Sequence, residues 1–322
     1  MKFSIIIADY NDHDICHNLL NSLLDTDLVG CEEKYEIIVV NDGSDDVFLM
    51  SEDNAAARNI KVLNRNINLG VGDAFDWGVS VAKGEYIILM GSDVHVGRKG
   101  WIADAVKSFS DSVYAGMGIM CFANIAHSGE DIDQEGTVRY GANMIWKMDG
   151  TELSFGHRHR GDVTYRDILQ GKWNLEYPSG GVGRVACLMG AMYLTTRSYY
   201  QRIRGFNGHR VWGGLEPMIS LKTWLSGGEI LINGEIANHH TFTRKGRLSD
   251  LQNYYANKIF IAQSTLKSYQ SRNLLNYFCN ITARKEALKH SYSYLYQHRD
   301  LINYLGGMLC YDVRDIEILN WE

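Results

Sequence analysis

A buried strand that ends in Asp93-Val-His95 is the feature of this sequence that most constrains its fold. The apolar run 86–90 shows no alternation, which is typical of a strand covered on both faces of a parallel sheet. Asp93 and His95 then lie at its carboxyl end, where open α/β sheets bind their ligands. Because side chains two residues apart in an extended segment point the same way, the carboxylate and the imidazole can approach one divalent cation. Taken alone, the pattern could equally be an aspartate that caps a turn beside an ordinary loop histidine.

Strands and helices alternate through the first hundred residues. Apolar runs at 3–8, 35–40 and 60–63 predict three further strands, and apolar residues at helical spacing follow the first of them between 15 and 24. A second helix is expected after Gly70. This order predicts an α/β fold with a mostly parallel, doubly wound central sheet, right-handed crossovers and helices on both faces.

Three aspartates follow the expected strands. Asp9, Asp42 and Asp93 each come where an apolar run ends. Because the carboxyl ends of parallel strands meet at one edge of a sheet, we expect all three carboxylates to open onto one crevice.

The second half of the chain is less regular. Residues 124–180 lack clear periodicity and are expected to form long loops on the substrate side, whereas 113–120 and 185–194 read as strands. Gly213-Gly214 is expected to open a helix that carries Glu216 in its first turn, where an acid gains from the positive helix end.

The remaining segments predict a hairpin and a helical end. Residues 229–232 and 235–239 flank an Asn-Gly pair, a typical hairpin turn, and the second run leads to His240. Stripes of apolar and Tyr residues at 251–266 and 284–304 predict C-terminal helices, in which the tyrosines are expected to pack rather than react.

Composition narrows the class of protein. The six cysteines form no C-x-x-C pair, and no run approaches the length of a membrane span, so we expect a cytoplasmic protein without disulfides. Residues 1–150 hold 11 Lys and Arg against 24 Asp and Glu, whereas 151–322 hold 21 against 14. This split indicates either that the second half faces an anion or that two solvated surfaces attract each other.

Motifs in the first 242 residues resemble those of GT-A nucleotide-sugar glycosyltransferases. The first hundred residues look like glycosyltransferase family 2, through Asn41-Asp-Gly-Ser44, Asn68-Leu-Gly70, Lys83-Gly-Glu-Tyr86 and the acid-ended strand. Residues 93–242 are similar to the polypeptide N-acetylgalactosaminyltransferases, through Asp93-Val-His95 (their D-x-H), Met189-Gly-Ala-Met-Tyr193, Trp212-Gly-Gly214 and His240-Thr-Phe242 (their H-x-F).

The resemblance implies a Rossmann-like GT-A fold and a UDP-sugar-dependent glycosyltransferase that moves a hexose or pentose. The nucleotide would contact residues at the strand ends and at the start of the second helix: Ala8, Asp9, Tyr10, Asp42, Gly70, Ser92, Asp93 and Gly190. A metal would be bound by Asp93, His95 and His240, and Glu216, Trp212 and Arg244 would be catalytic, with Glu216 addressing the transferred sugar or the acceptor.

The metal chemistry agrees with this ligand set. A divalent cation neutralises a departing nucleoside diphosphate as a Lewis acid, and an acid with imidazoles suits Mn²⁺ better than Mg²⁺. His239 could replace His240, because a register shift of one residue in a strand swaps faces. Arg244 and its basic neighbours could close over the diphosphate, or they could form a solvated surface loop.

Some positions depart from the family pattern and leave the donor and the stereochemistry open. Leu215 separates Gly-Gly from the acid, Met218 replaces a second acid, and Phe75 stands where many relatives have Arg. An inverting enzyme would need Glu216 as general base. The D-x-H and H-x-F motifs favour retention, in which the leaving phosphate accepts the proton.

The expected organisation is a catalytic domain at 1–248, with a nucleotide-binding half (1–96) and an acceptor and metal-completing half (97–248), followed by a helical extension at 249–322. Residues 157–299 hold 20 Lys and Arg against 8 Asp and Glu, with interleaved aromatic residues. This favours hydroxymethylated bases of phage DNA as acceptor, in the host cytoplasm. A glycan or lipid-linked acceptor is comparably supported, and a non-catalytic protein that binds nucleotides or nucleic acid on the same scaffold is the alternative from another class.

Overall fold

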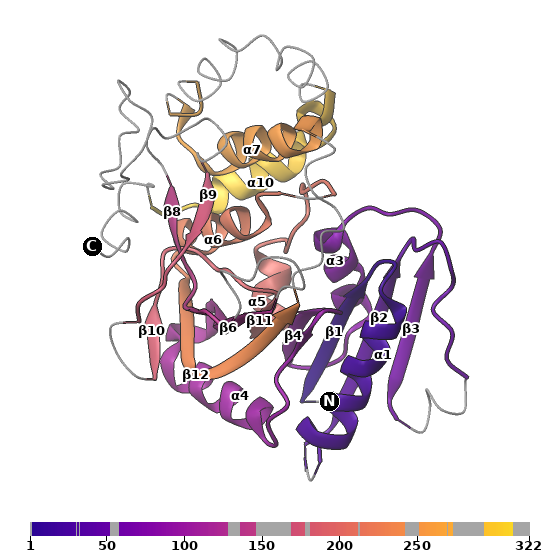
Figure 1. Cartoon of the computed structure of the whole chain (residues 1–322). Helices are drawn as coiled ribbons and strands as arrows, with labels where there is room; N and C mark the ends of the chain where they lie inside the picture. Colours follow the sequence, from indigo (N-terminus) through magenta and orange to yellow (C-terminus); the bar gives the residue numbers. More distant parts are fainter. Residues whose placement is uncertain are drawn as a thin grey trace.

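Figure 1 shows the computed structural model of the chain, in which helices flank a central sheet. The predicted mixed α/β architecture with a helical C-terminal part is confirmed. The structure describes residues 2–29, 31, 33–51, 58–127, 136–145, 169–177, 181–211, 213–241, 251–268, 270–272 and 293–311.

The first half of the chain forms the parallel part of the sheet. Its strands are β1 (Phe3–Asp9), β2 (Tyr35–Asp42), β3 (Ile60–Arg65) and β4 (Tyr86–Gly91). β1 lies between β2 and β4, β3 is at the edge beyond β2, and every one of these pairs is parallel. The helices α1 (His13–Ser22), continued by a π-helical turn at Leu23–Asp27, and α3 (Val71–Val81) connect these strands.

The second half extends the same sheet with mixed pairing. Next to β4 come β11 (Met192–Thr196), β6 (Gly118–His127), β12 (Glu229–Thr241) and β10 (Val182–Arg184). β11 is antiparallel to both β4 and β6, whereas β12 is parallel to β6. The sheet is completed by β5 (Val94–His95) against β12 and β7 (Val138–Arg139) against β6, while β8 (Ala142–Ile145) and β9 (Gln170–Trp173) form a separate pair.

The predicted hairpin around Asn233-Gly234 is wrong. One long strand, β12, runs through both expected strands and stays beside β6, with an irregularity in register between Asn233 and Ala237. The Asn233 side chain accepts a hydrogen bond from Glu235 N at 2.9 Å, and Gly234 N donates to Gly181 O at 3.1 Å. The Asn-Gly pair therefore forms a bulge, because a neighbouring strand satisfies the backbone on both sides of it.

Two other predicted strands are displaced. The run at 113–120 is a 3-10 turn (Tyr114–Gly116) followed by β6, and only the last residues of 185–194 belong to a strand, β11. Residues 185–191 are buried or partly buried and have no ladder pairing apart from a bridge between Cys187 and Ala142. The continuous apolar runs thus predicted which residues are mostly buried, but they did not predict where the strands begin and end.

The two faces of the sheet carry separate cores. Along β1, Ile5 and Ile7 pack in the cluster that includes α1 and α4 (Trp101–Ser112). Ile6 and Ala8 pack in the other cluster, with α3 and α6 (Leu215–Leu225). Because successive side chains of a buried strand point to opposite faces of the sheet, β1 contributes to the helix layers on both faces.

The C-terminal helices lie on the α6 side of the sheet, at the top of Figure 1. They are α7 (Leu251–Thr265) and α10 (Arg299–Met308), which contact each other, and α7 also contacts α6. The short α5 (Arg197–Arg202) follows β11. Residues 284–292 of the helix predicted at 284–304 lie outside the described residues, and α10 begins within the rest.

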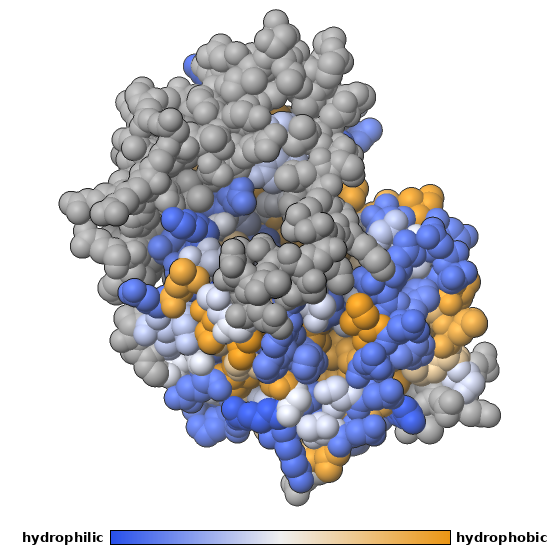
Figure 2. Space-filling model, in the orientation of Figure 1, coloured by the Kyte–Doolittle hydropathy of each residue, from blue (hydrophilic) through white to orange (hydrophobic). Residues whose placement is uncertain are grey.

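In Figure 2, hydrophilic and apolar residues alternate in small groups over the described part of the face shown. Among the described helices, none has the length and apolarity needed to cross a membrane. The five described cysteines are free thiols.

A buried lysine fixes the turn that leads into α6. Lys222 Nζ donates to Gly205 O at 2.8 Å and to Asn207 O at 3.1 Å. Burial lowers the pKa of Lys222 to about 8, while the nearby Asp76 carboxylate opposes that shift. Asp76 accepts bonds from Tyr200 Oη at 2.6 Å and Phe206 N at 3.0 Å, and burial raises its pKa to about 6.

Lys222→Met should lower the free energy of unfolding by about 3 kcal/mol at pH 7, because a buried carboxyl loses its cation and two carbonyls lose a donor. Between the ordinary Asp pKa of 3.8 and about 6, folded Asp76 keeps a proton that the unfolded chain releases, so its contribution to stability falls as pH rises through this window. The loss caused by Lys222→Met should therefore be smaller at pH 5, by about 1 kcal/mol. Urea unfolding at both pH values, with the exposed Lys107→Met as control, checks this; equal losses at both pH values would contradict it.

Candidate active site

The structure brings the three predicted aspartates to one edge of the sheet. Asp9 and Asp42 are the last residues of β1 and β2, and Asp93 follows β4 by two residues. Ala8 pairs with Gly91, and Ser92 N donates to Ala8 O at 3.1 Å, which joins the ends of β1 and β4. The three acids thus share one edge of the sheet, as the order of the strands predicted.

Asp42 is buried and has several hydrogen-bond and ion-pair partners. Its Oδ1 accepts from Leu69 N at 3.0 Å and its Oδ2 from Gly70 N at 2.8 Å, while Arg65 forms an ion pair with the same carboxylate. Burial raises the pKa of Asp42, and these donors oppose that shift. The carboxylate thus ties the end of β2 to the loop before α3.

Gly70 occupies a position that other residues would not fit. Its φ is +97°, and a Cβ there would lie 2.1 Å from Val211 O. Gly70 and Val211 form a parallel bridge, so the close approach joins the loop before α3 to the segment that precedes Gly213-Gly214. The resemblance placed Gly70 at the nucleotide, and the geometry adds a packing role.

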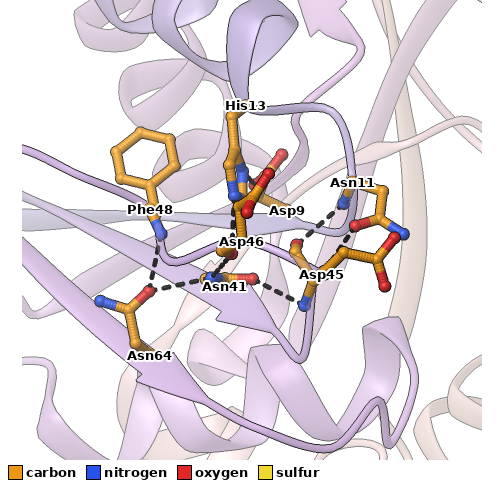
Figure 3. Close-up of polar contacts among 9 residues, drawn as sticks. Asp9, Asn11, His13, Asn41, Asp45, Asp46, Phe48 and Asn64 are labelled. Atoms are coloured by element: carbon orange, nitrogen blue, oxygen red, sulfur yellow. Dashed lines mark hydrogen bonds and ion pairs between the residues drawn. The ribbon is translucent and has the colours of Figure 1, made fainter.

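Figure 3 shows a polar network around the end of β1 and the loop after β2. His13 pairs with Asp9 and places its Nε2 3.0 Å from Asp46 O. Asn41 donates to Asp46 O at 3.1 Å and to Asn64 Oδ1 at 2.9 Å. These bonds hold the loop against the end of β1, and Tyr10, the residue after β1, is 44% exposed.

Asp93 and His240 lie together, but His95 does not join them. Asp93 Oδ2 is 3.2 Å from His240 Nε2. The His95 ring instead stacks on His239, with 5.1 Å between ring centres, and His239 Nδ1 is 2.7 Å from His127 Nε2. The cause is the register of β5 against β12, which pairs His95 with His239 and Val94 with His240.

The Asp93–His240 pair fits two adjacent positions around a divalent ion. Two ligands at right angles, each about 2.1 Å from an ion, lie about 3 Å apart. Within the described residues, no three His, Cys, Asp or Glu side chains converge as a protein-only metal site requires. Asp93 and His240 could thus supply two ligands of a divalent ion, and the role of His95 stays a prediction.

Glu216 lies where the sequence placed it, in the first turn of α6. Gly213 and Gly214 precede it with φ of +92° and +81°, which residues with a side chain rarely adopt. Tyr193 Oη donates to Glu216 Oε1 at 3.2 Å. Burial raises the pKa of Glu216, and the hydrogen bond from Tyr193 and the nearby His240 oppose that shift.

Other predicted site residues are only partly placed. Gly190 has a φ of +96° beside Asn124, on the segment that leads into β11. The predicted catalytic residues Trp212 and Arg244, and the basic loop after His240, lie outside the described residues.

This fold is shared with solved glycosyltransferase structures. The crystal structure of GalNAc-T7 with UDP, GalNAc and Mn²⁺ matches with a TM-score of 0.59 and 16% identity, over 82% of this chain and 48% of that one. The structure of S. aureus TarS 1–349 with UDP-GlcNAc matches with a TM-score of 0.56 and 14% identity, over 99% of this chain and 90% of that one. The family model for glycosyl transferase family 2 matches residues 4–159. The chain has the GT-A fold and is related to glycosyltransferase family 2.

Curated relatives match this GT-A chain over part of their own length. A poly(ribitol-phosphate) beta-glucosyltransferase of Bacillus spizizenii is 36% identical over 102 residues, which are 31% of this chain and 16% of that protein. A putative polypeptide N-acetylgalactosaminyltransferase 13 of Drosophila melanogaster is 24% identical over 291 residues, 82% of this chain and 48% of that protein. The GT-A chain thus spans less than half the length of either.

Sequence reasoning missed several residues that shape this GT-A site. Arg65 and the Asp9 partner His13 were not singled out, nor was Asn64. Tyr193 was seen only as part of a small-residue strand, not as the partner of Glu216. Arg65 lies directly opposite Asp42 in the β2–β3 register, so pairing the predicted strand ends could have found it.

Proposed function

We propose that this chain is a metal-dependent glycosyltransferase that moves a sugar from a UDP-sugar to an acceptor hydroxyl. The observation that carries the proposal is the Asp93–His240 pair, 3.2 Å apart, at the same sheet edge as Asp9 and Asp42. The family 2 match and the GT-A neighbours solved with UDP or UDP-GlcNAc support the donor class.

In this proposal the end of β1 and the loop after β2 bind the nucleoside. Tyr10 is exposed at that edge, and Asp42 with Arg65 holds the loop before α3 in place. Asp93 and His240 would hold Mn²⁺, or Mg²⁺, which when bound neutralises charge on the departing diphosphate. The pair's separation and its oxygen and nitrogen donors support Mn²⁺.

We propose retention for the stereochemistry. Glu216 then serves to orient the donor sugar or the acceptor hydroxyl, and the leaving phosphate accepts the proton. The hydrogen bond from Tyr193 holds the Glu216 carboxylate in place for this role.

Two acceptor classes follow from different observations. The basic stretch 157–299 favours hydroxymethylated bases in phage DNA, although its loops at 157–168, 242–250 and 273–292 lie outside the described residues. The names of the relatives, which act on poly(ribitol-phosphate) or polypeptides, favour a hydroxyl on a polyol, glycan or side chain.

The test is the release of nucleoside diphosphate from a panel of UDP-, GDP- and TDP-sugars, with Mn²⁺ or with EDTA. We expect Mn²⁺-dependent release from a UDP-sugar, and faster release when a true acceptor is added. No release from any donor, even with polyol, glycan and hydroxymethylated DNA acceptors present, would refute the transferase.

Glu216→Gln should lower kcat about 10- to 100-fold, because one hydrogen bond from a charged group is weakened while the shape is kept. NMR of the product should still show the anomeric configuration of the donor. The matched control is Glu235→Gln, an exposed acid on β12, which should leave kcat unchanged. A loss greater than about 1,000-fold together with an inverted product would instead make Glu216 the general base.

A further inference from the structure

A pocket of about 410 Å³ lies between α3 and the C-terminal helices. Its volume falls within the range of about 300–1,000 Å³ that is usual for small-molecule sites. Figure 1 shows α3 facing the end of the molecule that carries α7 and α10. The pocket is lined by the first turns of α3, by the segment before Gly213 and by residues of the helical extension.

Aromatic rings supply one part of the lining. Tyr294 and His298 contact each other edge to face, with 4.1 Å between ring centres, and Phe206 lines the same space. The Arg210 guanidinium lies 3.6 Å from the centre of the Tyr294 ring, which fixes that ring in place. Rings of this kind offer flat apolar surfaces to the C–H faces of a sugar.

The polar part of the lining carries more carboxylates than cations. Asp73 pairs with Arg65, and Asp76 accepts from Tyr200 and Phe206 beside Lys222. Arg210 is the cation of the lining, against two carboxylates. Such a pocket repels a polyphosphate and suits a neutral ligand that presents hydroxyl groups to carboxylate and amide oxygens.

The pocket adjoins the proposed transfer site through two short links. Leu69 lines the pocket and donates its backbone N–H to Asp42. Val211 lines it too, pairs with Gly70, and lies five residues before Glu216. A ligand in the pocket therefore contacts both segments that frame the donor side.

We infer that this pocket is the acceptor subsite and takes a neutral saccharide or sugar-alcohol unit. The assignment as an acceptor subsite rests on the proposed function. The binding of a saccharide in the pocket does not depend on it. It also assigns a role to the helical extension, since Asn253, Tyr294 and His298 come from it. The acceptor class it favours is a polyol or glycan rather than DNA.

Saturation-transfer NMR on the full chain tests binding, with N-acetylglucosamine, methyl glucoside and ribitol as probes. Asn253→Leu keeps the size of the side chain and removes its polar atoms, and Tyr294→Ala removes a ring; each should weaken binding of the preferred probe about tenfold. The matched control is Tyr296→Ala, an exposed tyrosine of the same segment that does not line the pocket. Thermal unfolding of each variant shows whether it is folded. If Tyr294→Ala does not fold, the binding measurement on Asn253→Leu alone decides the test.

Donor hydrolysis without acceptor separates this inference from the proposed function. We expect the variants to hydrolyse the donor with an unchanged KM while the KM for the acceptor rises about tenfold. Probe binding that is lost in Asn253→Leu supports the pocket even if no donor is hydrolysed. Absence of probe binding to the parent chain, or equal binding by Asn253→Leu and the parent, overturns it. Transfer to a hydroxymethylated duplex that is lost in Asn253→Leu would overturn the saccharide assignment.

Discussion

Asp93→Asn is expected to lower kcat/KM for donor turnover about 1,000-fold in the presence of Mn²⁺. The substitution keeps the size of the side chain and removes the charge that, with His240, would hold the ion. Loss of several kcal/mol of charge stabilisation on the departing diphosphate corresponds to this factor. Steady-state assays of nucleoside diphosphate release, over a range of Mn²⁺ concentrations, measure it.

The control for Asp93→Asn is Asp104→Asn, an exposed aspartate on α4 that pairs with Arg98. It should turn over donor at the parent rate. Because the Asp93 side chain is 21% exposed and has one described ion-pair partner, its substitution should change the midpoint of unfolding little. Turnover by Asp93→Asn at the parent rate would remove Asp93 from the site.

The second large effect is expected on stability. Asp42→Asn should lower the free energy of unfolding by about 3 kcal/mol, because Arg65 loses its buried counter-charge and amide nitrogen replaces one of the accepting oxygens. Denaturant unfolding measures this, and UDP affinity should fall with it as the loop before α3 loosens. The exposed Asp45→Asn, in the same loop region, should change stability by less than about 0.5 kcal/mol.

The two outcomes for Asp42 separate a structural role from direct binding. Unchanged stability with lost UDP binding would show that the carboxylate meets the nucleotide directly, as the resemblance alone implies. Lost stability with UDP affinity recovered in stabilising osmolyte would show that it acts by holding Leu69 and Gly70.

The parallel half of the fold was predictable because its signal is local. Unbroken apolar runs predicted β1, β2 and β4, and the acids at their ends then had to share one edge. Glu216 was predictable for a similar reason, since two glycines before a helix place the next acid in its first turn.

The parts that sequence reasoning did not resolve depend on which strands become neighbours. Asn233-Gly234 is a hairpin signal in isolation, but β6 offers β12 a long parallel partner and the pair becomes a bulge. A second strand pairing, of β5 with β12, decides which histidine lies beside Asp93. The choice between His239 and His240 was open in the sequence, and the register of β5 on β12 brings His240 to Asp93 and places His239 against His95.

The Arg65 ion pairs show a further limit of motif reasoning. Arg65 belongs to no motif, yet it links Asp42 to Asp73 and thereby the end of β2 to the pocket beside α3. Its role follows from the register of β2 on β3, which sets Asp42 opposite Arg65. This register is a property of the tertiary structure and is not visible in a local motif. Its partner Asp73 lies eight residues further along the chain, on α3.

The central claim is that Asp93 and His240 form, with a divalent ion, the site for a nucleoside diphosphate. Its most direct test is a calorimetric titration of UDP into the protein with Mn²⁺ and with EDTA, repeated on Asp93→Asn. We predict that Mn²⁺ raises UDP affinity at least about tenfold and that Asp93→Asn abolishes this gain. UDP affinity that is the same with Mn²⁺ and with EDTA would contradict the claim and favour a protein that binds nucleotides on a GT-A scaffold without transfer.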